Sequence, residues 1–352
     1  MQAPVHSRAR SVDRADRAWD QALTLLSEGN PLDIAVSYHE TVTKLQGLDL
    51  PGKGPFDRLD WFALLEDPLF VQAERGGEQL ILPLQVGPSG LSSLTNWFSF
   101  TWRPLGSSDL LLRAIARDLR RRAYLLDLAP VPEEDGSASR LETAFRKAGW
   151  LVFRQQCDEN HVLQVEGRSF AEYWAMRPGK MRTTLKRKAK KVDVEILDRF
   201  DEVAWADYRA VYAESWKPNE ERADILEAFA RTEGEAGRIR LGIARAEGRP
   251  VAAQFWTVED GAAYIHKLAH IEAAKPLSAG TTLSAALFER VIDTDRVELV
   301  DFGTGSDPYK RDWMELNRPR YRLTCLDWRQ LGAWPAIGRA LIRHLAPHNR
   351  PS

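Results

Sequence analysis

Apolar residues in the first half of the chain follow strand and helix spacings in a clear order. Two apolar runs flank Gly76-Gly77, which indicates a hairpin, and LSSLTNWFSF supplies a third strand. A Ser-capped helix in SSDLLLRAIARDLRRR, a buried strand in AYLLDLAPV and a helix over 137–147 follow. The paired strands LVFRQQ and HVLQV close this half, which we predict as β-β-β-α-β-α-β-β.

The second half repeats this order. After the basic segment RPGKMRTTLKRKAKK come strand VDVEIL, helices over 202–215 and 222–231, and strands IRLGIAR, PVAAQFWTV and AAYIHKLAH. A helix over 281–292, strand VELVDFG, a short helix from Pro308 and strand YRLTCLDW complete it. A repeat of about 150 residues is too long for a solenoid and suggests two copies of one α/β domain with a mixed sheet.

This repeat predicts the domain organisation. We expect an N-terminal domain over 1–166, opened by helical patterns at 12–26 and 61–65, and a C-terminal domain over 167–330. Residues 331–352 form a closing helix and tail, and the apolar face of LGAWPAIGRALIRHLAP is expected to cap the second domain.

Composition narrows the class of protein. The chain is 44% hydrophobic and 28% charged, and its net charge of -1 gives no global attraction to nucleic acid or anionic lipid. The N-terminus lacks a signal-peptide pattern and no segment is apolar enough to span a membrane, which predicts a cytoplasmic protein. Cys157 and Cys325 stand alone, so we expect reduced structural thiols and no metal site.

The turn before the helix in LSAGTTLSAALFE is the first candidate site. Ser278, Ala279 and Gly280 are small enough for a phosphate to approach the backbone, and the helix that begins there favours an anion. Thr281 and Thr282 add hydroxyl donors. The alternative is an ordinary Ser-capped helix. The matching turn of the first half carries Asp109, whose carboxylate takes the place of an anion, so that half is expected to bind no phosphate.

The second candidate site is the loop in VELVDFGTGSDPYKRDWMEL. Strand residues Asp301 and Gly303 lead into a polar loop at the carboxyl edge of a sheet, where α/β proteins commonly bind ligands. Asp307, Tyr309 and Lys310 then offer a carboxylate, a phenol and a cation within one turn, which suits proton transfer and charge stabilisation. A solvated turn with an Asp–Lys pair is the alternative.

These motifs, together with ESWK at 214–217, resemble the BioF2-like or CelD-like acetyltransferases, a branch of the GNAT superfamily related to the FemAB peptidyltransferases. The resemblance is close over 170–330 and loose over the first half. It implies tandem GNAT-like domains that bind acetyl-CoA or another acyl-CoA where a central strand parts from its neighbour. The residues implied in donor binding are Lys267, Leu268, Ala269, Ser278, Ala279, Gly280, Thr281 and Thr282.

The sequence departs from the family in its phosphate-binding turn. The usual pattern has an Arg or Gln followed by two glycines, whereas this turn offers Lys275 and only Gly280. FemAB proteins use aminoacyl-tRNA and carry a Tyr-Lys pair that resembles Tyr309-Lys310. No coiled-coil insertion of the FemAB kind is visible, so we favour an acyl-CoA donor.

The resemblance implies that an amine attacks the thioester directly. Tyr309 would protonate the departing thiolate and Lys310 would stabilise negative charge, while Glu214, Asp307 and His266 are unranked candidates for the base. Trp216, Asp301 and Gly303 are candidates for substrate binding, with Trp216 expected on the acceptor side. The acceptor is expected to be an amine of a small molecule, a sugar or a cell-envelope precursor.

Two alternatives stay open. One is a FemAB-like transferase that takes its acyl group from aminoacyl-tRNA, which would give the basic segment 177–191 a role. That segment otherwise suggests RNA, an anionic glycan, a membrane surface or merely a solvated helix face. The other alternative is a non-catalytic module that binds an anionic ligand. The sequence leaves the acceptor and the oligomeric state open.

Overall fold

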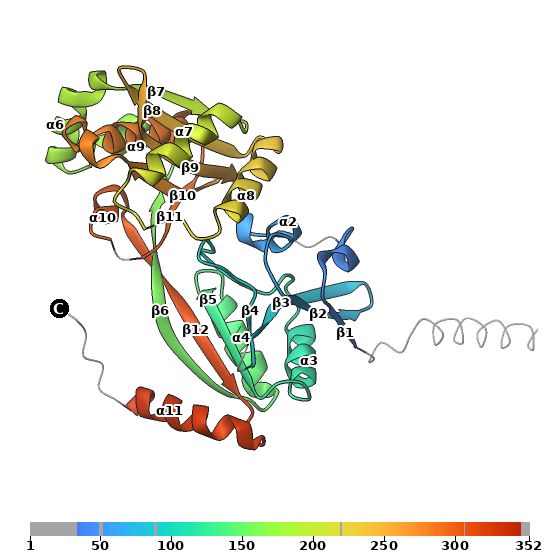
Figure 1. Cartoon of the computed structure of the whole chain (residues 1–352). Coiled ribbons are helices and arrows are strands. Elements are labelled where there is room, and N and C mark those ends of the chain that lie inside the picture. Colours follow the sequence, from blue (N-terminus) through green and yellow to red (C-terminus); the bar gives the residue numbers. More distant parts are fainter. Residues whose placement is uncertain (1–33, 49–51, 88–89, 219, 306, 346–352) are drawn as a thin grey trace, which may run out of the picture.

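The structure, a computed structural model, describes residues 34–48, 52–87, 90–218, 220–305 and 307–345. The helix predicted at 12–26 lies outside these residues. Over the described part, a single twelve-stranded mixed sheet runs through the molecule in the order β1-β2-β3-β4-β5-β12-β6-β11-β10-β9-β8-β7, with helices packed along it (Figure 1).

The N-terminal half supplies one end of the sheet. Its strands are β1 Ala35–His39, β2 Pro68–Arg75, β3 Glu78–Gly87, β4 Gly90–Ser93, β5 Leu125–Pro132 and β6 Leu151–Gln164, and its helices are α2 Leu59–Phe62, α3 Asp109–Leu119 and α4 Ser137–Lys147. Helix α3 begins where the Ser108 hydroxyl accepts a hydrogen bond from the Leu111 amide. Its apolar residues Leu111, Leu112 and Ile115 lie on one face and are buried.

The C-terminal half supplies the other end. Its strands are β7 Asp193–Leu197, β8 Ile239–Ala246, β9 Arg249–Glu259, β10 Ala262–His270, β11 Leu299–Thr304 and β12 Leu316–Leu326. Its helices are α5 Phe170–Ala175, α6 Gly179–Lys188, α7 Glu202–Ala213, α8 Ala223–Glu235, α9 Ala279–Glu289, α10 Lys310–Trp313 and α11 Trp334–Leu345. The short 3-10 helix Glu272–Leu277 joins β10 to α9.

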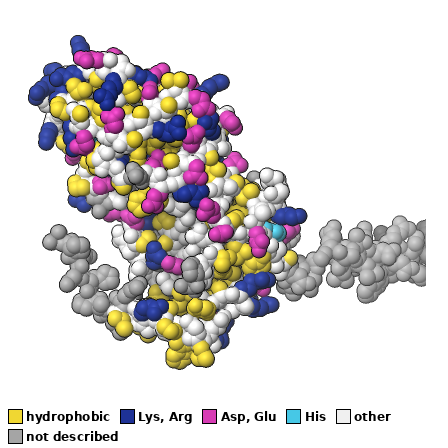
Figure 2. Space-filling view, in the orientation of Figure 1, with side chains coloured by type: hydrophobic (Ala, Val, Ile, Leu, Met, Phe, Trp, Pro, Cys, Tyr) yellow, Lys and Arg dark blue, Asp and Glu magenta, His cyan; other side chains and the backbone are white. Residues whose placement is uncertain are grey.

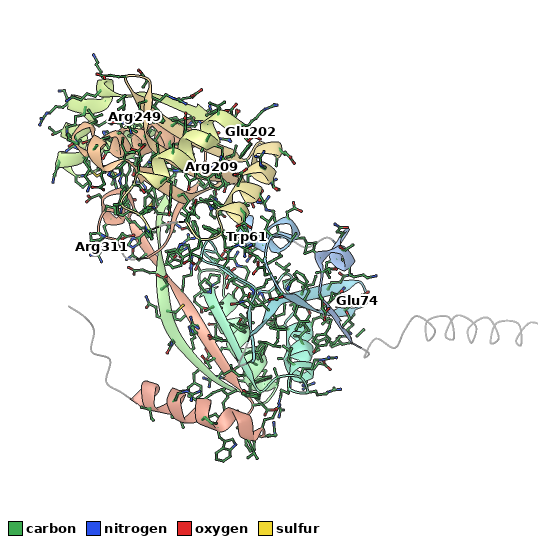
Figure 3. All side chains as sticks on the ribbon, viewed as in Figure 1. Trp61, Glu74, Glu202, Arg209, Arg249 and Arg311 are labelled. Atoms are coloured by element: carbon green, nitrogen blue, oxygen red, sulfur yellow. The ribbon has the colours of Figure 1, made fainter. Side chains whose placement is uncertain are left out.

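The two halves exchange strands. β12 lies between β5 and β6 in the N-terminal part of the sheet, while β6 pairs along β12 and also with β11. Trp61 of α2 packs edge-on against Phe229 of α8 at 5.1 Å, so the apolar core also crosses the junction (Figure 3). The division at 166/167 therefore remains a prediction, since neither half completes its own sheet.

Two expectations from the sequence are wrong. LVFRQQ and HVLQV are not a pair of strands, because the polar residues between them continue one strand, β6, which pairs with β12 along most of its length. Helix α11 does not cap the C-terminal half. It lies at the far end of β6 and β12, against the N-terminal half (Figure 1).

No helix among the described residues combines the length and the apolar character needed to cross a bilayer. Cys157 and Cys325 are both free thiols.

Candidate active site

The parallel strands β10 and β11 part in the middle of the sheet. They pair over three residues only, from Ala262 opposite Leu299 to Tyr264 opposite Asp301. Beyond that point β10 bulges between Ile265 and Lys267 and continues to His270 beside β9. The edge of β10 that faces β11 is therefore left open over half of its length, which is the parting that the resemblance implied.

Two cavities open on this split and meet. The helix-side cavity, about 380 Å³, lies between the end of β10, the start of α9, and α10. The loop-side cavity, about 520 Å³, lies between the β10 bulge, the β11–α10 loop and the loop 95–100 of the N-terminal half. Leu268, Phe302 and Tyr309 line both cavities, so they mark the junction.

The helix-side cavity is bordered by the first turn of α9. Ala279, Gly280 and Thr281 line it, and their amides precede the first intrahelical bond, which runs from the Thr282 amide to the Ser278 carbonyl at 3.1 Å. These amides and the positive end of the helix dipole therefore border the cavity. Ser278 has a left-handed backbone with φ of 56° and lines the cavity as well.

Two lysines lie beside this turn. Lys275 lines the helix-side cavity, and the Lys188 ammonium of α6 donates to the Ser278 hydroxyl at 3.1 Å. Thr282 is buried and does not line the cavity, although the sequence suggested it for donor binding. The turn thus combines free amides with nearby cations, which together suit an anion.

Trp216 and His270 form another wall of the helix-side cavity. Their rings lie 4.3 Å apart, and an isolated bridge between Ser215 and Ile271 fixes the loop that carries Trp216. The structure therefore places Trp216 at the helix-side cavity, and its expected role on the acceptor side stays a prediction. Leu268 and Ala269 line the same cavity, as expected.

Tyr309 lies at the junction of the cavities. Its ring packs edge-on against Phe302 at 5.7 Å, and its side chain stays partly exposed. Burial, with the nearby Asp307 carboxylate, raises the pKa of the Tyr309 phenol well above its ordinary value of 10. The phenol is therefore protonated at neutral pH and can donate a proton into either cavity.

Asp307 and Lys310 both line the loop-side cavity. The Lys310 ammonium donates to the Thr304 carbonyl, and burial lowers the pKa of this lysine. Its cation lies 5.5 Å from the Phe302 ring centre. The cluster predicted from the sequence is thus brought together at one cavity.

Lys217 is a cavity residue to which sequence reasoning gave no role. Burial and the nearby Lys267 cation lower its pKa from 10.5 to about 8. Lys267 itself points into the loop-side cavity and pairs with Glu220 at 3.0 Å. Lys267 was expected at the donor site, but its ammonium lies over the Phe98 ring at 4.5 Å, on the loop side.

His266 is enclosed by aromatic rings. Phe56, Phe100 and Phe255 lie 5.0 to 5.8 Å from its ring, and its Nε2 is 2.7 Å from the Thr257 hydroxyl. Burial lowers the pKa of His266 to about 3. An imidazole that binds protons so weakly is a poor base, and its packing points to a structural role.

Two further residues suggested by the sequence, Glu214 and Asp301, line neither cavity. Glu214 lines neither cavity and pairs with Arg249 at 2.7 Å on the outer surface of the C-terminal half, where Figure 3 labels Arg249. The Asp301 carboxylate is buried, where it accepts from Asn160 and from the Gly303 amide at 2.7 Å, and burial raises its pKa. Asp301 thus shapes the turn at Gly303, which does line the loop-side cavity.

The corresponding gap in the N-terminal half is closed. The parallel pair β4–β5 also stops after two residues, but Trp102 fills the space beyond it. Its amide donates to the Pro130 carbonyl and its indole to the Pro83 carbonyl, both at 2.8 Å. Asp109 in the first turn of α3 pairs with Arg140 at 2.8 Å. These contacts leave the split between β10 and β11 as the candidate site.

Comparison with known proteins agrees with this geometry. Residues 179–311 match the family described as acetyltransferase (GNAT) domain. This segment is therefore similar to a GNAT acetyltransferase domain, which supports an N-acyltransferase as the class of enzyme. No protein with a curated description has a sequence significantly similar to this chain.

Solved structures extend the likeness over most of the fold. L-PGS from Bacillus licheniformis is 14% identical with a TM-score of 0.53, covering 81% of this chain and 91% of that one. The C-terminal domain of a putative lysylphosphatidylglycerol synthetase from Agrobacterium fabrum is 12% identical with a TM-score of 0.53, over 81% and 91%. FemX is 10% identical with a TM-score of 0.57, over 80% and 94%. FemX thus shares the fold of this chain, whereas the BioF2-like or CelD-like subgroup remains a prediction.

Proposed function

We propose that the protein transfers an acyl group, acetyl in the simplest case, from acyl-CoA to an amine. The observation that carries this proposal is the junction of the two cavities at Tyr309. One cavity borders the free amides of a helix start, and the other borders a cluster of titratable side chains. A donor in the first and an acceptor in the second would meet at the junction formed by Leu268, Phe302 and Tyr309.

Support for the donor comes from the chemistry of the helix-side cavity. The amides of Ala279, Gly280 and Thr281 suit a diphosphate, and Lys188 adds positive charge near it. Lys275 lines the same cavity but pairs with Glu272 at 2.6 Å. The unpaired edge of β10 can hydrogen-bond an extended amide-containing chain such as the pantetheine arm of CoA. Acyl-CoA supplies a thioester, whose carbonyl carbon is the electrophile in the transfer.

The proposed reaction exchanges one bond for another. The acceptor nitrogen forms a bond to the carbonyl carbon, the carbon–sulfur bond breaks, and the thiolate leaves with a proton from Tyr309. Backbone amides at the Ile265–Lys267 bulge are the candidates to stabilise the negative charge on the carbonyl oxygen. Lys310 contributes positive charge from the loop side.

An incoming ammonium must lose a proton before it can attack. Of the three bases suggested by the sequence, His266 and Asp307 line the loop-side cavity, and the pKa of about 3 for His266 makes it a poor base, which leaves Asp307. Lys217 lines the same cavity with a pKa of about 8, so a large part of it is neutral in mildly alkaline solution. We therefore propose Asp307 and Lys217 as the proton-accepting groups.

The loop-side cavity is the proposed acceptor site. The N-terminal half contributes Asn96, Trp97 and Ser99 to its rim, and Trp97 is 89% exposed. Such an exposed indole offers a flat apolar surface to a ring, while Asn96 and Ser99 can hydrogen-bond hydroxyls. These groups suit an amino sugar, a small amine or a cell-envelope precursor. A cytoplasmic location stays part of the proposal.

The direct test is a thiol-release assay. The full chain is mixed with acetyl-CoA and a panel of amino sugars, amino acids and polyamines, and free CoA thiol is followed with a thiol reagent. The proposal predicts acceptor-dependent release that saturates with acceptor concentration. If no amine in the panel accelerates release although acetyl-CoA binds, the site is a binding module of the kind that the sequence left open.

A second donor has one specific observation in its favour. Helix α6 carries Lys180, Arg182, Lys186, Arg187 and Lys188 with no acidic residue, and Lys188 reaches the donor turn. A basic helix in this place suits the phosphates of an aminoacyl-tRNA as well as those of CoA. Transfer that requires charged tRNA and ignores acetyl-CoA would select this alternative.

A further inference from the structure

The C-terminal helix α11 turns large apolar side chains away from the rest of the protein. No side chain described over 334–342 is buried. Trp334, Leu341 and Ile342 are 61%, 46% and 71% exposed, and the preceding segment adds Leu331 at 83%. In Figure 2, hydrophobic side chains gather on the surface at the lower end of the view, where α11 lies in Figure 1.

The orientation of the helix explains this exposure. With 3.6 residues per turn, Trp334, Leu341 and Ile342 lie on one side of α11, and Ala336 and Ala340 lie on another. The two alanines line a cavity of about 850 Å³ between α11, α4 and the strands β5, β6 and β12. The small side chains therefore face the protein, while the large ones face solvent.

A hydrogen bond and a cation–π contact hold the start of α11 in place. The Trp334 indole donates to the Trp328 carbonyl at 3.1 Å, and the Arg329 guanidinium lies over the Trp328 ring at 4.8 Å. Two partly exposed tryptophans, Trp328 and Trp334, are thus held together at one end of the molecule, and a cation lies over the Trp328 ring. Tryptophans with neighbouring arginines are typical of segments that lie at a membrane–water interface.

The charge around α11 indicates which kind of partner it would bind. From residue 328 to its end, the sequence has four arginines and no Asp or Glu. At the same end, Arg121 and Arg122 follow α3, are largely exposed and share one carboxylate, Asp118, so one positive charge remains in excess. Two copies of such a face would repel each other, whereas an anionic lipid surface would attract it and accept its apolar side chains.

We propose that α11, with the segment 328–333, is an interfacial helix that docks the protein on anionic lipid bilayers. The helix would lie in the plane of the interface with Trp334, Leu341 and Ile342 inserted, without crossing the bilayer. This inference is independent of the donor and the acceptor.

Sedimentation with lipid vesicles tests the proposal. The full chain is mixed with vesicles of phosphatidylcholine alone or with 30% phosphatidylglycerol, with roughly 0.05 and 0.5 M salt compared. We expect binding to the anionic vesicles that weakens at high salt. Leu331→Ser/Trp334→Ser/Ile342→Ser should weaken this binding at least ten-fold, and Arg329→Glu should weaken it to a smaller extent.

The matched control is Val203→Ser, which removes a 69% exposed valine from α7 in the other half and should bind as the parent does. An unchanged melting temperature shows that the triple variant is folded. Equal binding by the triple variant and its parent would overturn the proposal. So would a lipid-independent dimer of the parent that the triple variant loses, because α11 would then pair with a second copy.

Discussion

Tyr309 is the residue whose position is most closely matched to its proposed task. It borders both cavities, and its phenol is protonated at neutral pH. Replacing it with Phe should lower the turnover number roughly 100-fold or more, because the leaving thiolate loses its proton donor. The dissociation constant for acetyl-CoA should change little. Thiol release and calorimetry on the same preparation measure both quantities.

Tyr321→Phe is the control for that comparison, since Tyr321 lies on β12 against Arg154 and outside both site cavities. Its turnover should match that of the parent. A Tyr309→Phe enzyme that turns over normally would remove the phenol from the mechanism.

The lowered pKa of Lys217 predicts how the rate of the reaction depends on pH. Burial disfavours its charged form, so its pKa of about 8 lies below the ordinary 10.5, and the neutral amine becomes available as pH rises through 8. The rate should therefore rise with pH, and this rising limb of the pH–rate profile should have its midpoint near pH 8. Lys217→Gln should abolish this limb, while Asp307→Asn should lower the rate and keep it.

The acceptor amine also titrates, so the pH profile needs two acceptors whose amine pKa values differ. The limb that belongs to Lys217 stays in place when the acceptor is changed. A limb that moves with the acceptor, or that survives in Lys217→Gln, would contradict the assignment.

At the scale of the element, the turn at Gly303 holds the end of β11 in place. Its φ is +71°, and a Cβ there would lie 2.7 Å from the Phe100 ring of the N-terminal half. Gly303→Ala should therefore lower the free energy of unfolding by about 1–3 kcal/mol, from backbone strain and this clash. Urea denaturation measures the loss.

Combining Gly303→Ala with Phe100→Leu separates the two causes. The smaller side chain should restore part of the stability that the clash removes, beyond the sum of the two single changes. If Gly303→Ala is as stable as the parent, the close approach of the two halves at this turn is wrong.

Elements with local signals were predicted well from the sequence. Helix α4 has the predicted bounds, 137–147, and α9 begins at Ala279, two residues earlier than expected. Both were found because the helical spacing of apolar residues is a local signal. Strand β6 was split in two because its polar centre resembles a turn, and only pairing with β12 from the distant C-terminus shows otherwise.

In the candidate site too, residues that are neighbours in the sequence were predicted, and residues brought together by the fold were not. Tyr309, Lys310 and Asp307 are neighbours in sequence and share a cavity, as expected. The role of Lys217 and the contribution of loop 95–100 depend on tertiary approach, for which the sequence carries no local signal. Lys267, which the sequence suggested for donor binding, lines the loop-side cavity, beside a bulge in β10 that the sequence does not indicate.

At the scale of the whole molecule, the exchanged strands make the two halves interdependent. Residues 167–352 alone lack β6, which covers one edge of β11, and β12 loses both of its neighbours, β5 and β6. Exposed strand edges promote association, so this fragment should aggregate when produced by itself. Co-production with 1–166 should yield a soluble complex with one cooperative unfolding transition.

Circular dichroism and size-exclusion chromatography of the fragment and of the complex check this prediction. A fragment 167–352 that is monomeric and unfolds cooperatively would show that the C-terminal half completes its own sheet.

The central claim is that the first turn of α9 binds the phosphates of an acyl-CoA donor. Calorimetric titration with acetyl-CoA tests it on the parent, on Thr281→Glu and on Thr281→Asn. A carboxylate in the first turn suits the helix dipole, so Thr281→Glu should fold normally. It should bind acetyl-CoA at least ten-fold more weakly than the parent and the neutral Thr281→Asn control. Equal affinity in all three proteins, or no binding to the parent, would contradict the account.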